Sequence, residues 1–127
     1  MIEIKKPVCF DVDDTLVMWN SVRPNIKIVD ETGYEGYYKV NQENVEAIKF
    51  RHEEGDTVIV WSHGGIEWAK KVVLALGLSK YVDVVADKPY IYYDDLDASK
   101  WMTRMYGRHV YHKPEDAKKV DYNEEEE

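Results

Sequence analysis

The residues best suited to chemistry in this sequence are acidic, and they follow a short apolar run. Asp11 and Asp13 come after the apolar residues 8–10, with one residue between them. If the chain stays extended there, residues two apart point to the same face. Two carboxylates that close repel each other, and a divalent cation relieves the repulsion. Mg²⁺ is the expected cation, because it prefers hard oxygen ligands and is held by one or two carboxylates together with substrate phosphate.

More polar residues adjoin other apolar segments of the chain. They are Ser62 and His63 after one segment, Lys88 before another, and the pair Asp94 and Asp95 at the end of that one. In a parallel sheet ligands bind beyond the carboxyl ends of the strands, so these residues are expected to converge on one edge. A carboxylate can attack phosphorus to form an aspartyl-phosphate, and the transfer depends mainly on positioning and charge stabilisation. Lys88 would offset negative charge there, and Asp13 could protonate the leaving oxygen and later deprotonate water.

The elements that must position these residues alternate between strand and helix. Strands are expected at residues 7–11, 57–61, 82–85, 90–93 and 109–111. Helices are expected at residues 41–54, 67–76 and 98–106, and a β-hairpin that turns near Gly33 is expected at residues 23–40. The middle helix has a clear apolar side, and Gly55 and Gly77 are suited to ending the first two helices. Alternation of this kind indicates an α/β fold with a mainly parallel sheet.

In their order and spacing, these motifs resemble those of the haloacid dehalogenase (HAD) superfamily of phosphohydrolases. The first family motif is an apolar strand followed by DxDxT[LV], and residues 8–17 read VCFDVDDTLV. The second is an apolar strand ending in Ser or Thr, and residues 58–62 read VIVWS. Lys88 fits the third motif, a lysine ahead of the fourth strand, and Asp94 with Asp95 fits the acidic pair that ends that strand.

The resemblance implies a Mg²⁺-dependent phosphatase that hydrolyses phosphomonoesters through an aspartyl-phosphate. It assigns Asp11 as the nucleophile and Asp13 as the acid and base, and it makes both of them metal ligands, Asp13 through its backbone carbonyl. Asp95 is the expected direct metal ligand of the acidic pair, with Asp94 in support. Asp14 stands where many relatives have glycine, which is a common variation in the family.

Phosphate oxygens are expected to be held by Ser62, by Thr15 and by backbone N–H groups near His63. The family often inserts a cap domain, but residues 17–41 leave room only for a hairpin flap, and residues 77–88 leave no room for a cap. The resemblance therefore implies a capless, three-layer Rossmann-like sheet of about five strands with an open site. The expected substrate is a small phosphorylated metabolite, a nucleotide or a nucleic-acid end.

Composition indicates the class of protein and its surroundings. The 127 residues fit one catalytic domain, expected at residues 1–114, with an acidic tail at 115–127 that is expected to be flexible. The HAD resemblance covers roughly residues 7–111. The formal net charge of −8 argues against general nucleic-acid binding, which depends on a basic surface. The sequence shows no apolar stretch long enough to span a membrane and no signal peptide, and its single cysteine, Cys9, indicates a reducing cytoplasm.

Two other classes of protein stay open on the residues alone. A receiver-like signalling domain also uses clustered aspartates, Mg²⁺ and a lysine, although its phosphoacceptor follows a central strand, where this chain has Ser62. An inactive metal-binding interaction module is the other alternative, although all four motif positions hold competent residues. A Ser–His hydrolase is disfavoured because neighbours such as Ser62 and His63 rarely meet in triad geometry and no G-x-S-x-G elbow is present. A cysteine phosphatase is disfavoured because the loop after Cys9 is acidic and would repel phosphate.

Overall fold

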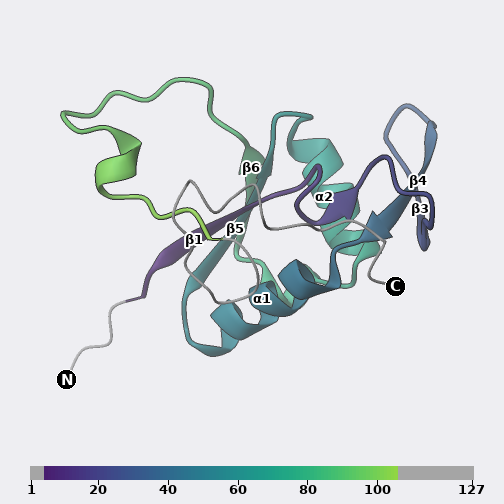
Figure 1. Ribbon diagram of the computed structural model, residues 1–127, viewed down its shortest axis with the longest axis horizontal. Helices are drawn as coiled ribbons and strands as arrows, with labels where there is room; N and C mark the ends of the chain where they lie inside the picture. Colours follow the sequence, from purple (N-terminus) through teal and green to yellow (C-terminus); the bar gives the residue numbers. More distant parts are fainter. Residues whose placement is uncertain (1–4, 106–127) are drawn as a thin grey trace.

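A three-stranded parallel sheet lies at the centre of the computed structural model, which describes residues 5–105 (Figure 1). Its strands are β1 (Pro7–Asp11), β5 (Thr57–Ser62) and β6 (Val84–Asp87), paired in the order β1-β5-β6. Asp11 pairs with Trp61 across β1 and β5, and Ser62 pairs with Asp87 across β5 and β6. The carboxyl ends of all three strands therefore meet at one edge of the sheet, as the sequence predicts.

A second, smaller sheet is antiparallel. Its strands are β2 (Val17–Met18), β4 (Glu35–Val40) and β3 (Ile26–Val29), in the order β2-β4-β3. β3 and β4 form the predicted hairpin, and Gly33 in its turn has a φ of 91°, which glycine adopts without steric cost. The hairpin predicted at residues 23–40 is thus confirmed, and it lies beside the loop that follows β1 (Figure 1).

Two α-helices connect the strands of the parallel sheet. In α1 (Gln42–Glu53), Asn41 caps the first turn by accepting a hydrogen bond from the backbone of Asn44 at 3.4 Å, and Gly55 follows the end with a φ of 87°. In α2 (Ile66–Ala75), the apolar side predicted from the sequence is buried, whereas Leu74 on the other side is 71% exposed. Both predicted helices are therefore confirmed.

One face of the parallel sheet is more deeply covered than the other. Along β5 the side chains of Val58, Val60 and Ser62 are fully buried, whereas those of Ile59 and Trp61, which point to the opposite face, are only half-buried. α1 packs against β5, and α2 packs against β5 and β6. The core joins this face to the hairpin, because Ile28 and Tyr38 are buried together with the sheet residues.

The prediction of a strand at residues 90–93 is wrong. These residues form an extended loop with no regular structure, in which Tyr90 is 80% exposed and Tyr93 is 97% exposed. Aromatic and β-branched residues favour strands only where a neighbouring strand supplies hydrogen bonds and packing. Pro89 begins this segment, and no strand of the described part of the chain lies alongside it.

The helix predicted at residues 98–106 reduces, within the described part, to a single 3₁₀ turn, η2 (Ala98–Lys100). Trp101 is 51% exposed and Met102 is 46% exposed, so these apolar side chains gain little of the packing that stabilises a short helix. The third strand begins two residues later than predicted, after a short 3₁₀ turn, η1 (Ser79–Tyr81). The strand predicted at 109–111 and the tail predicted at 115–127 lie outside the described residues.

The described parallel sheet therefore has three strands rather than the expected five or so. The chain forms a mixed α/β structure of one parallel sheet, one small antiparallel sheet and two α-helices across residues 5–105. No helix in this range has the length and apolar character needed to cross a bilayer.

Candidate active site at the carboxyl edge of the sheet

A tight loop directly after β1 presents Asp13. The carbonyl of Val12 accepts hydrogen bonds from three successive backbone N–H groups, those of Thr15, Leu16 and Val17, at 2.8–3.2 Å. The side chains of Val12, Leu16 and Val17 are fully buried, so the loop is anchored in the core. The loop is also tied to α1, because Asn44 donates a side-chain hydrogen bond to the carbonyl of Thr15 at 2.9 Å. No contact places the hydroxyl of Thr15, a predicted phosphate ligand, against the other site residues described here.

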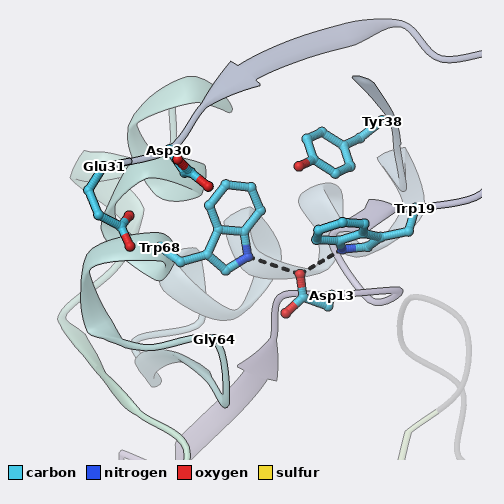
Figure 2. A pocket seen from close by; sticks show the side chains of 7 residues that line it. All are labelled: Asp13, Trp19, Asp30, Glu31, Tyr38, Gly64 and Trp68. Carbon is cyan, nitrogen blue, oxygen red and sulfur yellow. Dashed lines mark hydrogen bonds between the residues drawn. The ribbon is translucent and has the colours of Figure 1, made fainter. Parts of the chain in front are cut away.

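The carboxylate of Asp13 accepts hydrogen bonds from three side chains. The indole N–H groups of Trp19 and Trp68 both donate to Oδ1, at 2.7 and 2.9 Å (Figure 2). The hydroxyl of Ser62 donates to Oδ2 at 3.2 Å, and it accepts the backbone N–H of Gly64 at 2.9 Å. The predicted meeting of Asp13 and Ser62 is thus present, and both carboxylate oxygens of Asp13 are engaged.

Asp11 and Lys88 are also brought together. The Lys88 ammonium lies 3.8 Å from Oδ2 of Asp11, and both side chains are about one-third exposed. Lys88 comes directly after β6, and its backbone N–H donates to the carbonyl of Ser62 at 3.0 Å, which fixes its position relative to β5. The lysine chosen from the sequence therefore does lie beside the predicted nucleophile.

His63 points to a different neighbour. Its ring stacks on that of Tyr90, with centroids 4.1 Å apart and planes 11° apart. Its Nε2 lies 3.4 Å from the carbonyl oxygen of Pro89. His63 therefore holds the loop after β6 against the loop after β5, which supports the placement of Lys88 in between. Ser62 is fully buried, while His63 is exposed.

Within residues 5–105, no hydrogen bond or ion pair joins Asp94 or Asp95 to Asp11 or Lys88. The loop that carries them leaves β6 and runs away to the left, whereas β1 runs toward the hairpin on the right (Figure 1). Asp94 instead accepts the backbone N–H of Leu96 at 2.9 Å, as an ordinary turn residue does. Across residues 5–105 no three acidic, histidine or cysteine side chains converge as metal ligands. The predicted set of four metal-binding aspartates is therefore not assembled in this structure.

A small pocket adjoins Asp13 on the side facing the hairpin. Its volume is about 190 Å³, and the residues that line it are Asp13, Trp19, Asp30, Glu31, Tyr38, Gly64 and Trp68 (Figure 2). The ring centroid of Tyr38 lies 5.0 Å from that of Trp19 and 5.7 Å from that of Trp68. Sequence reasoning assigned Trp68 only to the apolar side of its helix. Its indole N–H could have pointed to a further role, since a buried tryptophan usually needs a hydrogen-bond acceptor.

Among residues 5–105, three side chains have a shifted pKa. Burial, and then the nearby charges of Tyr34, Asp13 and Asp30, raise the pKa of Tyr38, so its hydroxyl stays protonated. Hydrogen bonding from the Thr32 hydroxyl lowers the pKa of Asp30, which stays ionised. Burial raises the pKa of Cys9, which keeps it a thiol. A cysteine nucleophile must be a thiolate, so this shift also disfavours a cysteine phosphatase.

Comparison with protein-family models, curated proteins and solved structures finds no match to this chain. The chemistry of the site is therefore argued from its own geometry. That geometry provides a partly exposed carboxylate beside a lysine, a second carboxylate hydrogen-bonded to a buried serine, and a pocket with aromatic and acidic walls.

Proposed function

We propose that this chain is a phosphomonoesterase of the HAD type, Mg²⁺-dependent, with Asp11 as its nucleophile. The observation that carries the proposal is the contact of Lys88 with Asp11, 3.8 Å apart, at the carboxyl edge of a parallel sheet. Ligands of open parallel sheets bind at this edge. A carboxylate that is partly exposed can be reached by a phosphate ester, and the neighbouring lysine offsets the negative charge of that ester.

The proposed reaction has two steps. An oxygen of Asp11 attacks phosphorus, the bond from phosphorus to the ester oxygen breaks, and the alcohol leaves with a proton from Asp13. A water molecule then gives its proton to Asp13 and attacks phosphorus, which releases inorganic phosphate and regenerates the Asp11 carboxylate. Lys88 supports both steps as a fixed positive charge near the phosphate oxygens.

The proton on Asp13 has a defined place in this scheme. Oδ1 accepts two indole N–H groups, which can only donate, so the proton belongs on Oδ2. The partner of Oδ2 is the hydroxyl of Ser62, which can rotate from donor to acceptor. Ser62 therefore lets Asp13 alternate between its charged and neutral forms without losing its hydrogen bond.

Mg²⁺ enters the proposal through the resemblance of the motifs, and when bound it would offset the charge of nucleophile and phosphate. The protein needs to supply only one or two carboxylates to this ion, which takes its other ligands from water and phosphate. The partly exposed carboxylate of Asp11 would be one such ligand, and the resemblance adds the backbone carbonyl of Asp13, whose side chain is already hydrogen-bonded to Trp19, Ser62 and Trp68. We assign no step to the ion.

The same proposal includes the finer fold type and the compartment. Two strand–helix–strand units, β1-α1-β5 and β5-α2-β6, support a Rossmann-like sheet, of which the described strands would form one half. The single cysteine supports a reducing cytoplasm as the site of action.

The decisive test is release of inorganic phosphate from a generic aryl phosphate ester as a function of Mg²⁺ concentration. Wild-type protein should turn over, and Asp11→Asn should lose activity by at least about 10³-fold, because the nucleophile is gone. Asp97→Asn, on an exposed turn, is the matched control and should keep wild-type activity. Absence of turnover with a whole panel of phosphoesters at every Mg²⁺ concentration would refute the proposal. A phosphorylated form that persists without turnover would instead favour a receiver-like domain.

A further inference from the structure

The walls of the pocket beside Asp13 are chemically distinctive. Three aromatic rings lie within 5.0–6.3 Å of one another, centroid to centroid, and they come from the loop after β2, from β4 and from α2. Tyr38 and Trp68 are buried, while Trp19 is 41% exposed and so stands at the opening to solvent. Aromatic rings of this kind attract cations through the negative potential of their faces.

The charged groups of the same pocket are all acidic. Asp13, Asp30 and Glu31 line it, and none of the seven residues known to line it is basic (Figure 2). Asp30 is held in place by hydrogen bonds from Thr32 and from the backbone of Tyr34 at 2.6–3.0 Å. A phosphate would be repelled by such walls, whereas a positive group would be attracted by rings and carboxylates together.

We propose that this pocket binds an alkylammonium group, and that this group belongs to the alcohol of the phosphate ester. The second half of the statement rests on the proposed function. Asp13 connects the two sites, because it lies two residues after Asp11 and also forms part of the pocket wall. The phosphate then lies by Asp11 and Lys88, and the ammonium lies in the pocket, against the partly exposed ring of Trp19 and near the carboxylates of Asp30 and Glu31. Asp13, which belongs to both sites, is the proposed proton donor to the ester oxygen.

The size of the pocket limits the alcohol. Its volume of about 190 Å³ lies below the roughly 300–1,000 Å³ of pockets that hold drug-sized ligands. A nucleotide would also bring further phosphates or a bulky base toward acidic walls. The substrate class is therefore a short phosphoester of an amino alcohol, preferably a methylated one, because aromatic walls favour weakly hydrated cations.

The binding experiment uses the indole N–H resonances of the protein in ¹H–¹⁵N NMR spectra. Choline and its neutral isostere 3,3-dimethylbutanol are titrated separately into the protein, and the four indole signals are assigned with Trp19→Phe, Trp61→Phe and Trp101→Phe, which leave Trp68 as the fourth. Choline should shift the Trp19 and Trp68 signals in a saturable manner, and Trp101, on an exposed loop, should not respond. Glu31→Gln should weaken the affinity for choline about two- to fivefold through loss of one charge. Glu46→Gln on α1 removes the same charge away from the pocket and should have no effect.

The hydrolysis experiment compares phosphocholine with 3,3-dimethylbutyl phosphate. Wild-type protein should favour the cationic ester by about tenfold in kcat/KM, a difference typical of a cation in a partly desolvated aromatic site. Equal shifts with choline and its neutral isostere, or an unchanged affinity in Glu31→Gln, would overturn the ammonium pocket even if aryl phosphate is hydrolysed. Choline binding without hydrolysis of any ester would support the pocket and refute the phosphatase. The two proposals can therefore fail independently.

Discussion

The carboxylate of Asp13 joins three separate parts of the chain. Its partners are Trp19 in the loop after β2, Ser62 at the end of β5 and Trp68 on α2. Each of these partners donates a hydrogen bond, so Asp13 accepts through both oxygens, which is the capacity of an ionised carboxylate. Asp13 therefore contributes to the stability of the fold as well as to the proposed reaction. The contribution of its hydrogen-bond partners can be measured as a change in the free energy of unfolding.

Removing the hydroxyl of Ser62 tests that structural part. Ser62→Ala removes the partner of the Gly64 N–H and of one Asp13 oxygen, both of which are only partly buried. We expect the free energy of unfolding in urea to fall by about 1–2 kcal/mol, because a hydrogen bond contributes about 0.5–1.5 kcal/mol net. Ser79→Ala, at an exposed position of η1, should change it by less than about 0.5 kcal/mol. Equal stability of the two variants would contradict the hydrogen-bond network.

Thr32 determines the ionisation of Asp30. Its hydroxyl donates to the carboxylate at 2.6 Å and lowers the pKa of Asp30 below the ordinary value of 3.8. A lowered pKa adds stability above the unfolded value, and this contribution is lost as the pH falls through the folded value. Thr32→Val should therefore raise the pKa of Asp30. The variant should also lose less stability than the wild type when the pH falls below about 4, because Asp30 then contributes less. NMR titration of the Asp30 carboxyl carbon measures the shift, and Thr103→Val, at an exposed position, should leave it unchanged.

At the scale of elements, the β3–β4 hairpin supplies an aromatic wall to the site. Tyr38 lies on β4 and is only 2% exposed, and its ring covers Gly36 of the same strand. A Cβ atom added at Gly36 would overlap the phenol ring of Tyr38. The glycine is therefore required by packing, because the ring of Tyr38 is also held between Trp19 and Trp68.

Gly36→Ala tests how firmly this element is packed. The added methyl group must push the Tyr38 ring toward the two tryptophans, and overpacking of this kind usually costs about 1–3 kcal/mol. We expect a lower melting temperature and shifted indole N–H signals of Trp19 and Trp68. Because the hydroxyl of Tyr38 is the nearest atom, Tyr38→Phe in the same chain should restore part of the lost stability. Wild-type stability of Gly36→Ala would show that the ring does not cover the glycine.

At the scale of the whole molecule, the formal net charge of −8 favours cationic ligands and opposes a compact state. Four of the negative charges belong to consecutive glutamates at residues 124–127. Repulsion between exposed charges is largely screened when they lie farther apart than a Debye length, which is about 10 Å at 0.1 M salt. Salt should therefore affect stability and choline binding in opposite directions.

Sodium chloride between 0.02 and 0.3 M provides the test. We expect the melting temperature to rise by a few degrees as repulsion is screened, and the affinity of the pocket for choline to fall. A chain ending at residue 123 has a net charge of −8 + 4 = −4 and should show a smaller salt effect on melting. A melting temperature that falls with salt would show that attractive ion pairs outweigh net repulsion.

The site itself was partly predictable. Lys88 beside Asp11, and Ser62 beside Asp13, follow from the rule that the carboxyl ends of parallel strands meet at one edge. The pocket beside them was not predictable, because Trp19, Tyr38 and Trp68 come from three elements whose packing no local pattern encodes. Their aromatic character is equally consistent with an ordinary core.

The elements that local sequence signals specify were predictable without the fold. β1, β5, the β3–β4 hairpin and both α-helices follow from apolar runs, hydrophobic periodicity, an asparagine cap and glycine at turns. The course of residues 88–105 follows instead from tertiary packing, and in it no hydrogen bond or ion pair joins Asp94 or Asp95 to Asp11. The physical reason is that a strand exists only if another strand accepts its hydrogen bonds, and a tyrosine-rich segment cannot specify its partner by itself.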